Sequence, residues 1–190
     1  NPSLVGSEMC IRDSAKGHEL TQLFTKGLIG GLTTDQIVNG YLTAAKLDTG
    51  TNRADNDAGT LVSGKNYTQM EHYWDEGFGY LYGEEADVEN PTLGNGVLLS
   101  KYAGKVDGSN SPGIGKIIYD AFKMGRAAIV AKNYAQRDAQ AKIIQMHVSK
   151  IIGYKAVDYL NDYVSKAAAG TPADAIHALS EGYGLSLIHI

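Results

Sequence analysis

The sequence predicts an all-α protein, a bundle of about six or seven helices. Apolar residues recur at intervals of three and four over long stretches, which is the period of a helix. Clusters of Gly, Asn, Asp and Thr separate these stretches and predict turns. No stretch shows the alternation typical of a strand. The chain has 190 residues, 43% of them hydrophobic, which is enough for one domain with a buried core.

The predicted helices follow one another with short connections, so we expect mostly antiparallel neighbours. In chain order, they cover residues 17–32, 35–47, 67–82, 96–103, 116–131, 135–169 and 172–184.

Glycine, threonine and proline set most of the predicted helix ends. Gly30 and Gly31 tolerate a positive φ and are expected to end the first helix, as Gly83 is expected to end the third. Thr171 and Pro172 predict the start of the last helix, as its N-cap and its first helical residue.

Two polar stretches, 48–65 and 104–115, are rich in turn-forming residues and predict loops. The longest predicted helix, 135–169, contains Gly153 in its interior, which suggests close packing or a bend. Its apolar stripe consists of Ile143, Ile144, Met146, Val148, Ile151, Ile152, Val157, Leu160 and Val164.

Charge and cysteine content exclude several classes of protein. The net charge is −4, so the chain lacks the strong basic field of a nucleic-acid-binding protein. One cysteine cannot form a disulfide framework or a cysteine-ligated zinc site within one chain. No apolar run approaches the ~18 residues that a membrane-spanning helix requires.

The two ends of the chain differ from the rest. Residues 1–14 (NPSLVGSEMCIRDS) and 185–190 (LSLIHI) resemble translated sequencing-adapter read-through. The alternative is a frayed N-terminus and a short apolar C-terminal segment. We therefore expect one helical-bundle domain over residues 15–184, a fragment truncated at both ends. Helices missing from such a fragment would leave an apolar face exposed.

Two helices carry candidate metal ligands at helical spacing. His72, Asp75 and Glu76 are spaced to share one helix face, and so are His177 and Glu181, with Asp174 in support. If the two helices face each other, imidazoles and carboxylates converge into a site suited to iron, zinc or manganese. A network of hydrogen-bonded polar groups would explain the same residues without a metal.

Other polar residues have simpler interpretations. Arg126 lies among small and apolar residues, so we expect it to pair with Asp75, Glu76 or Glu181. His18 is expected to be an exposed residue near a helix start, and His147 a packing residue. The sequence lacks an HExxH motif, a complete phosphate-binding loop, a complete EF-hand and a nucleophile elbow.

Three segments carry a family resemblance: residues 67–82 (YTQMEHYWDEGFGYLY), 123–129 (KMGRAAI) and 177–184 (HALSEGYG). With residues 17–42, they resemble an uncharacterised helical lipoprotein domain family of Bacteroidota that is associated with imelysin-like proteins. The resemblance implies an imelysin-like bundle, a periplasmic or outer-membrane location and an iron-uptake context with envelope uptake proteins as partners. The His-x-x-Glu signature of imelysins is not reproduced, because His72 reaches Asp75 at that spacing and His177 reaches Glu181 one residue later.

The leading hypothesis is a non-enzymatic envelope domain that binds a metal ion, with iron as the first choice. A lipid anchor outside this sequence would be its only link to the membrane, and no nucleic acid is expected as a partner. The alternative is a structural or interaction module with a His, carboxylate and Arg network. A metal-dependent hydrolase, with Glu76 or Glu181 as the base, is a third possibility.

Overall fold

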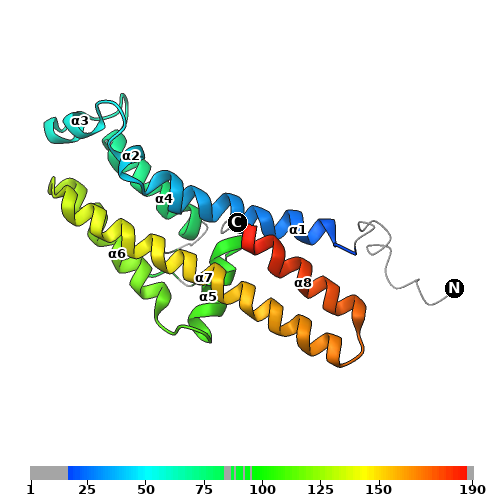
Figure 1. Ribbon diagram of the computed structural model, residues 1–190. Helices are drawn as coiled ribbons and strands as arrows, with labels where there is room; N and C mark the ends of the chain where they lie inside the picture. The colour runs from blue at the N-terminus through cyan, green and yellow to red at the C-terminus, as the bar shows by residue number, and fades with distance from the viewer. Residues whose placement is uncertain (1–16, 84–86, 88, 92, 95, 188–190) are drawn as a thin grey trace. The chain divides into compact units, whose positions relative to one another are not determined.

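The computed structural model describes residues 17–83, 87, 89–91, 93–94 and 96–187 (Figure 1). These residues form eight α-helices, two π-helical segments and no strand, which confirms the all-α prediction. The proposed adapter-derived segment 1–14, residues 188–190 and most of the acidic stretch at 84–88 lie outside the described residues. No helix within the described ranges is both long and apolar enough to cross a membrane.

The described chain divides into two compact units. The first consists of residues 17–32 and 152–187, and the second of residues 33–151. The elements are α1 Leu20–Gly27, η3 Leu28–Thr34, η4 Gln36–Tyr41, α2 Ala44–Leu47, α3 Asn52–Ala58, α4 Gln69–Tyr82, α5 Leu98–Gly108, α6 Ile114–Val130, α7 Tyr134–Ala168 and α8 Pro172–Ser186.

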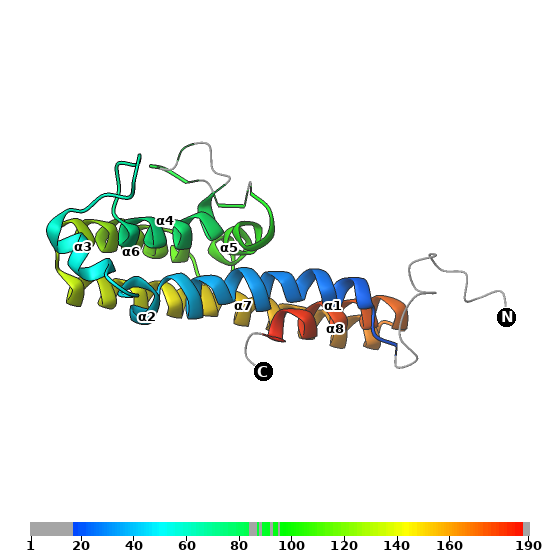
Figure 2. The ribbon, with the colours of Figure 1, turned by 90° about the horizontal axis from the view of Figure 1, so that it is seen from above.

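In the first unit, α1 and α8 lie side by side (Figures 1 and 2). The adjoining η3 also meets α8, because a Cβ atom at Gly30 would stand 2.3 Å from the backbone oxygen of Leu185. The prediction that Gly30 and Gly31 end the first helix is therefore wrong. Neither glycine has a positive φ, and the helix continues past α1 as η3 because Gly30 serves close packing.

The C-terminal helix starts and ends differently from the prediction. Pro172 is its first residue, as predicted, but the Thr171 side chain makes no capping hydrogen bond and instead donates to the Lys166 carbonyl. The helix also runs past Gly184 to Ser186, and the side chain of Leu185 is fully buried.

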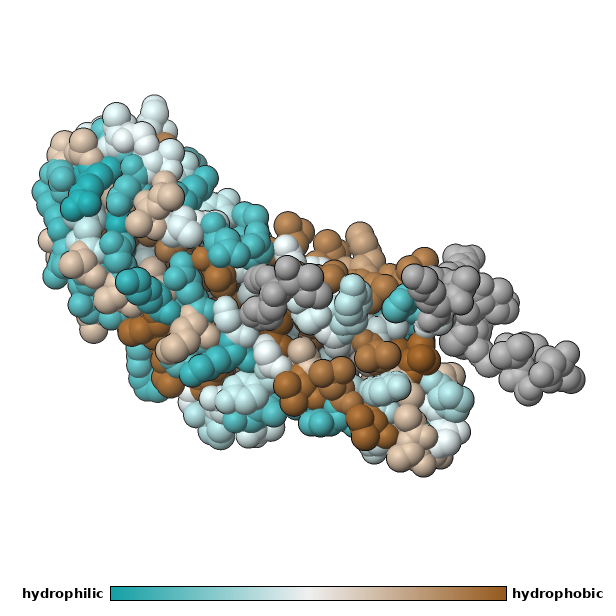
Figure 3. All heavy atoms as spheres, viewed as in Figure 1, coloured by the Kyte–Doolittle hydropathy of each residue, from teal (hydrophilic) through white to brown (hydrophobic). Residues whose placement is uncertain are grey.

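Apolar side chains gather on the surface of the first unit (Figure 3). Along α1 and η3 they follow a spacing of four, with Leu20 52%, Phe24 70%, Leu28 37% and Leu32 50% exposed. In the first half of the α7 stripe, which belongs to the second unit, Ile144, Val148 and Ile151 are buried and Met146 is 48% exposed. Beyond Ile152, its members Val157 and Leu160 are exposed. An exposed apolar face, as expected from the sequence, is thus present.

In the second unit, α4 is the central helix and contacts η4, α2, α3, α5 and α6. It confirms the helix predicted at 67–82 and its end at Gly83. A capping box starts it: the Thr68 hydroxyl accepts from the Glu71 amide, and the Glu71 carboxylate accepts from the Thr68 amide.

The contact between α4 and α6 depends on a glycine. Trp74 is 1% exposed and its indole nitrogen donates to the Phe122 carbonyl over 3.0 Å. A Cβ atom at Gly125 would lie 2.0 Å from Cζ2 of this indole, so only glycine leaves room for the ring.

Three short elements differ from the prediction. The loop predicted at 48–65 contains α3, and the helix predicted up to Leu47 is interrupted at Thr43, whose side chain caps α2. The helix predicted at 96–103 extends as α5 to Gly108. The Thr43 cap starts α2 anew, and α3 and α5 are supported by their contacts with α4 and α6.

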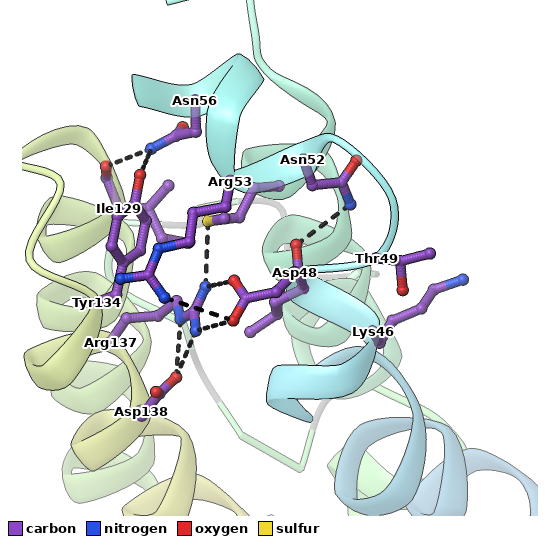
Figure 4. Close-up of polar contacts among 12 residues, drawn as sticks. Lys46, Asp48, Thr49, Asn52, Arg53, Asn56, Ile129, Tyr134, Arg137 and Asp138 are labelled. Carbon is purple, nitrogen blue, oxygen red and sulfur yellow. Dashed lines mark hydrogen bonds and ion pairs between the residues drawn. The ribbon is translucent and has the colours of Figure 1, made fainter. Parts of the chain in front are cut away.

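A fully buried arginine joins α7 to the segment after α2 (Figure 4). Arg137 is 0% exposed and makes two hydrogen bonds to Asp48, with Nη1–Oδ1 at 2.6 Å and Nη2–Oδ2 at 3.1 Å. Its Nε also donates to Asp138 over 2.8 Å. A buried guanidinium requires such partners because its desolvation is otherwise uncompensated.

A second polar network lies beside this pair. Asn56 donates to the Ile129 carbonyl and to the Tyr134 hydroxyl (Figure 4). It also accepts from the Thr68 hydroxyl. The network therefore connects α3, α4, α6 and α7 within the second unit. No buried side-chain polar atom of the described residues lacks a partner.

We expect Asp48→Ala to lower the free energy of unfolding by about 3 kcal/mol, because Arg137 stays buried with Asp138 as its one remaining carboxylate partner among the described residues. Urea unfolding followed by circular dichroism measures the change. Asp120→Ala is the matched control, since Asp120 is 56% exposed and its ion pair with Lys116 should contribute less than about 1 kcal/mol. Equal losses in the two variants would contradict the assignment.

The same pair predicts a pH dependence. Hydrogen bonds from Arg137 hold the pKa of Asp48 below its ordinary value of 3.8. A lowered pKa means that this carboxylate stabilises the fold above about pH 4 and loses its contribution as the pH falls through the folded-state pKa. The loss of stability between pH 5 and pH 2 should therefore be shallower in Asp48→Ala than in the unmodified chain.

Candidate functional site

The residues predicted to bind a metal fall into two sets. His72, Asp75 and Glu76 lie on α4 in the second unit. His177 and Glu181 lie on α8 in the first unit. Each set has its own partners within its unit.

On α4, His72 is part of an aromatic surface. Its Nε2 lies 3.5 Å from Oε1 of Glu76, as the spacing of four predicts. Its ring stacks on Tyr67 at 5.1 Å between centroids, with an interplanar angle of 13°. Both side chains of the pair are partly exposed, at 37% for His72 and 42% for Glu76.

Further tyrosines lie on α4 and η4. The Tyr41 ring packs against Tyr73 and Tyr80, and the Lys46 ammonium lies 4.2 Å from the centroid of Tyr73. Burial, followed by the charge of Glu76, raises the pKa of Tyr41. The carboxylate of Glu76 thus lies near a half-buried tyrosine cluster.

In the first unit, His177 lies between two carboxylates. Its Nδ1 is 2.7 Å from Oε2 of Glu19 and its Nε2 is 3.5 Å from Oε2 of Glu181. Lys26 approaches the other oxygen of Glu181 at 3.0 Å. The two ring nitrogens point to different carboxylates, and a metal ion would use only one of them.

No group of three or more His, Cys, Asp or Glu side chains within the described residues is arranged to hold a metal ion. The predicted support, Asp174, is exposed in the first turn of α8. Two other histidines have simple local contacts: His18 stacks on Tyr183, and His147 donates to the Ile143 carbonyl in its own helix.

Arg126 pairs with two carboxylates of α4. Its Nη1 donates to Oε1 of Glu71 over 2.6 Å, and its Nε donates to Oδ1 of Asp75 over 3.0 Å. The predicted partner Asp75 is therefore confirmed, and Glu71 is a second partner that the sequence did not reveal. Glu76 pairs with His72 instead, and Glu181 with Lys26 and His177.

The pKa values of the two carboxylates beside Arg126 are shifted in opposite directions. Burial alone would raise the pKa of Glu71, but the Thr68 amide and Arg126 outweigh it and hold this pKa below its ordinary value. Burial raises the pKa of Asp75, and Arg126 opposes the rise only in part. Glu71 thus serves as a structural anion, while Asp75 borders an apolar space.

That space is a pocket of about 440 Å³ between α4 and α6. Its size suits a small ligand. The walls are mostly apolar, with aromatic rings and polar groups at a few points. The lining residues are Trp74, Asp75 and Phe78 from α4, and Tyr119, Phe122, Lys123, Arg126, Ala127 and Val130 from α6.

Ring contacts hold the aromatic wall together. Phe78 meets the Phe122 ring edge-on at 5.4 Å between centroids and the Tyr82 ring at 4.8 Å. Trp74 meets the Phe122 ring at 5.9 Å, also edge-on. These packed rings preorganise an apolar surface, so a ligand would not have to order it.

The sequence predicts the helices that line this pocket, but it does not predict the pocket itself. Trp74 and Phe78 are four residues apart and so share one side of the helix predicted at 67–82, and Arg126 is predicted to be paired. The roles of Tyr119, Phe122 and Lys123 depend on the pairing of α4 with α6, which a single sequence does not specify.

From residue 7 to residue 188, the chain matches the profile of a family described as "Domain of unknown function (DUF4856)". The chain belongs to this family. The match confirms the resemblance to an uncharacterised domain family, and it includes part of each terminal segment that the sequence links to adapters. No curated protein matches the chain, and neither does any solved structure.

Replacing the two carboxylate partners of Arg126 should have unequal effects in this DUF4856 domain. We expect Glu71→Ala to cost about 1–2 kcal/mol, because it removes the capping box and a 12% exposed ion pair together. Asp75→Ala should cost less than about 0.5 kcal/mol, because that side chain is 51% exposed. Thermal and urea unfolding measure the stability of the two variants. Equal losses of stability would refute the assignment of Glu71 as the structural partner of Arg126.

Proposed function

We propose that this domain is a non-enzymatic helical binding module of the bacterial cell envelope, and that the pocket between α4 and α6 is its binding site. The single observation that carries the proposal is this preorganised aromatic pocket with the Asp75–Arg126 pair at its border. A largely apolar pocket with a few placed polar groups is the usual form of a small-molecule site.

Internal pairing of the other polar groups supports a binding role. Arg137, Asn56 and Glu71 are used by the fold, and His177 is held between Glu19 and Glu181. These groups have structural partners that a catalytic role would have to displace. The pocket, by contrast, presents apolar surface and charges that border open space.

The envelope location rests on the sequence resemblance to imelysin-associated lipoproteins of Bacteroidota. In that setting, a lipid anchor outside this sequence would hold the module at a membrane, and uptake proteins would be its neighbours. The pocket would then present its ligand to such a partner.

Occupancy of the pocket can be followed through Trp74, because it is the only tryptophan of the chain and lines the pocket. We expect titration with 1-octanol to change its fluorescence saturably. Ala127→Phe should abolish the change by filling the pocket. Ala139→Phe, at an exposed position of α7 outside the pocket, should retain it. A linear, unsaturable response in the unmodified protein would refute the proposal.

Metal uptake, with His72, Asp75, Glu76, His177 and Glu181 as ligands for iron, zinc or manganese, stays a prediction of the sequence. Under our proposal these residues form internal pairs. We therefore expect no stoichiometric metal by mass spectrometry after purification without chelator, and an unchanged result in His72→Ala and His177→Ala. One metal per chain that is lost in both variants would instead join the two motifs into one site and support uptake.

A further inference from the structure

The aromatic pocket of the second unit has two positive groups that the fold does not fully use. Lys123 lies in the lining, and its ammonium is 5.4 Å from the centroid of the Tyr119 ring. No carboxylate of the described residues forms an ion pair with it. Lys116, about two turns earlier on α6, is paired with Asp120.

Arg126 supplies the second positive group. Its Nε and Nη1 donate to Asp75 and Glu71, whereas its Nη2 has no acceptor among the described side chains and carbonyls. The guanidinium side chain is 30% exposed. An arginine fixed on one edge by carboxylates keeps its other edge ready for an anion, without further loss of side-chain freedom.

The position of these groups favours an anion over a cation. Aromatic faces attract cations, and Asp75 adds a carboxylate to the lining. One oxygen of that carboxylate already accepts from Arg126, and Lys123 and Arg126 both repel a second cation. The polar groups of the pocket that can still bind a ligand are therefore mainly the N–H donors of Lys123 and Arg126.

The apolar part of the pocket lining indicates what the uncharged part of the ligand is like. Phe78, Phe122 and Val130 contribute apolar surface, and Val130 is 63% exposed at the C-terminal end of α6. Burial of a chain of seven or eight carbons there would be favourable, because it removes apolar surface from water.

We infer that the pocket takes a small apolar molecule carrying one carboxylate or comparable monoanion. Its body packs against Phe78 and Phe122, and its anionic group meets Nζ of Lys123 and Nη2 of Arg126. The inference deepens the proposed function and rests on it, because it specifies the ligand of the same pocket.

Three probes of equal length test the charge of the ligand: octanoate, 1-octanol and octylammonium. None absorbs where tryptophan is excited, so Trp74 fluorescence reports each titration directly. We expect octanoate to bind about tenfold more tightly than octanol, because a charge-assisted contact adds to the same apolar burial. Octylammonium should bind more weakly than octanol.

Two matched lysine variants locate the anion. Lys123→Gln should remove most of the advantage of octanoate over octanol and leave octanol binding unchanged. Lys116→Gln removes the same charge from the same helix, but Lys116 does not line this pocket, so the advantage should persist. Circular dichroism checks that both variants are folded; both lysines are exposed.

The outcomes separate this inference from the proposed function. Equal affinities for the three probes, tightest binding of octylammonium, or an equal effect of both lysine variants would overturn the inference while pocket binding stands. Failure of every probe to give saturable binding would overturn both. An octanoate preference that is lost only in Lys123→Gln supports both.

Discussion

The indole ring of Trp74 occupies the space in which a side chain at position 125 would stand. This steric constraint determines how closely α4 and α6 approach, and the other features of the second unit follow from that approach. It brings Arg126 within reach of Glu71 and Asp75, and it places the aromatic residues of both helices along one pocket. A rigid ring against a glycine leaves no range of alternative spacings, so the pocket is fixed by the core itself.

Charged groups in this domain fall into two classes according to their surroundings. Glu71 and Arg137 are held by several partners and have little exposure, so their charges support the fold. Asp75, Lys123 and the free edge of Arg126 border open space beside aromatic rings. The distinction rests on the cost of desolvation: a buried charge needs its partners at all times, whereas a charge at a pocket rim can exchange water for a ligand.

The sequence predicted the fold class and the long helices because periodicity and capping are local signals. The helix α4 followed from its apolar spacing and the glycine at its end, and α7 from its apolar stripe at helical spacing. Other features depended on the tertiary partner of a residue. Gly30 has the composition of a helix end, yet Leu185 determines its role. Asp48 lies in a stretch that was predicted to be a loop. Its pairing with Arg137 could not be predicted, because the hydrogen bonds between them join residues 89 positions apart.

The candidate site also combines features that local spacing predicts with features that depend on tertiary contacts. Spacings of four correctly placed His72 beside Glu76 and His177 beside Glu181, since a helix fixes such neighbours. Periodicity gives no information on what a helix faces. It could not reveal that Glu19 and Lys26 complete the surroundings of His177, or that Lys123 borders the pocket.

The close contact at Gly30 has a consequence for how this sequence can change over time. Where two bulky side chains meet, a larger residue on one helix can be accommodated by a smaller one on the other. Here the obstacle is the backbone oxygen of Leu185, which no exchange of side chain at that position removes. Position 30 therefore has no compensating partner, and relatives that keep this pairing of η3 with α8 should retain glycine there while the exposed positions of α1 drift freely.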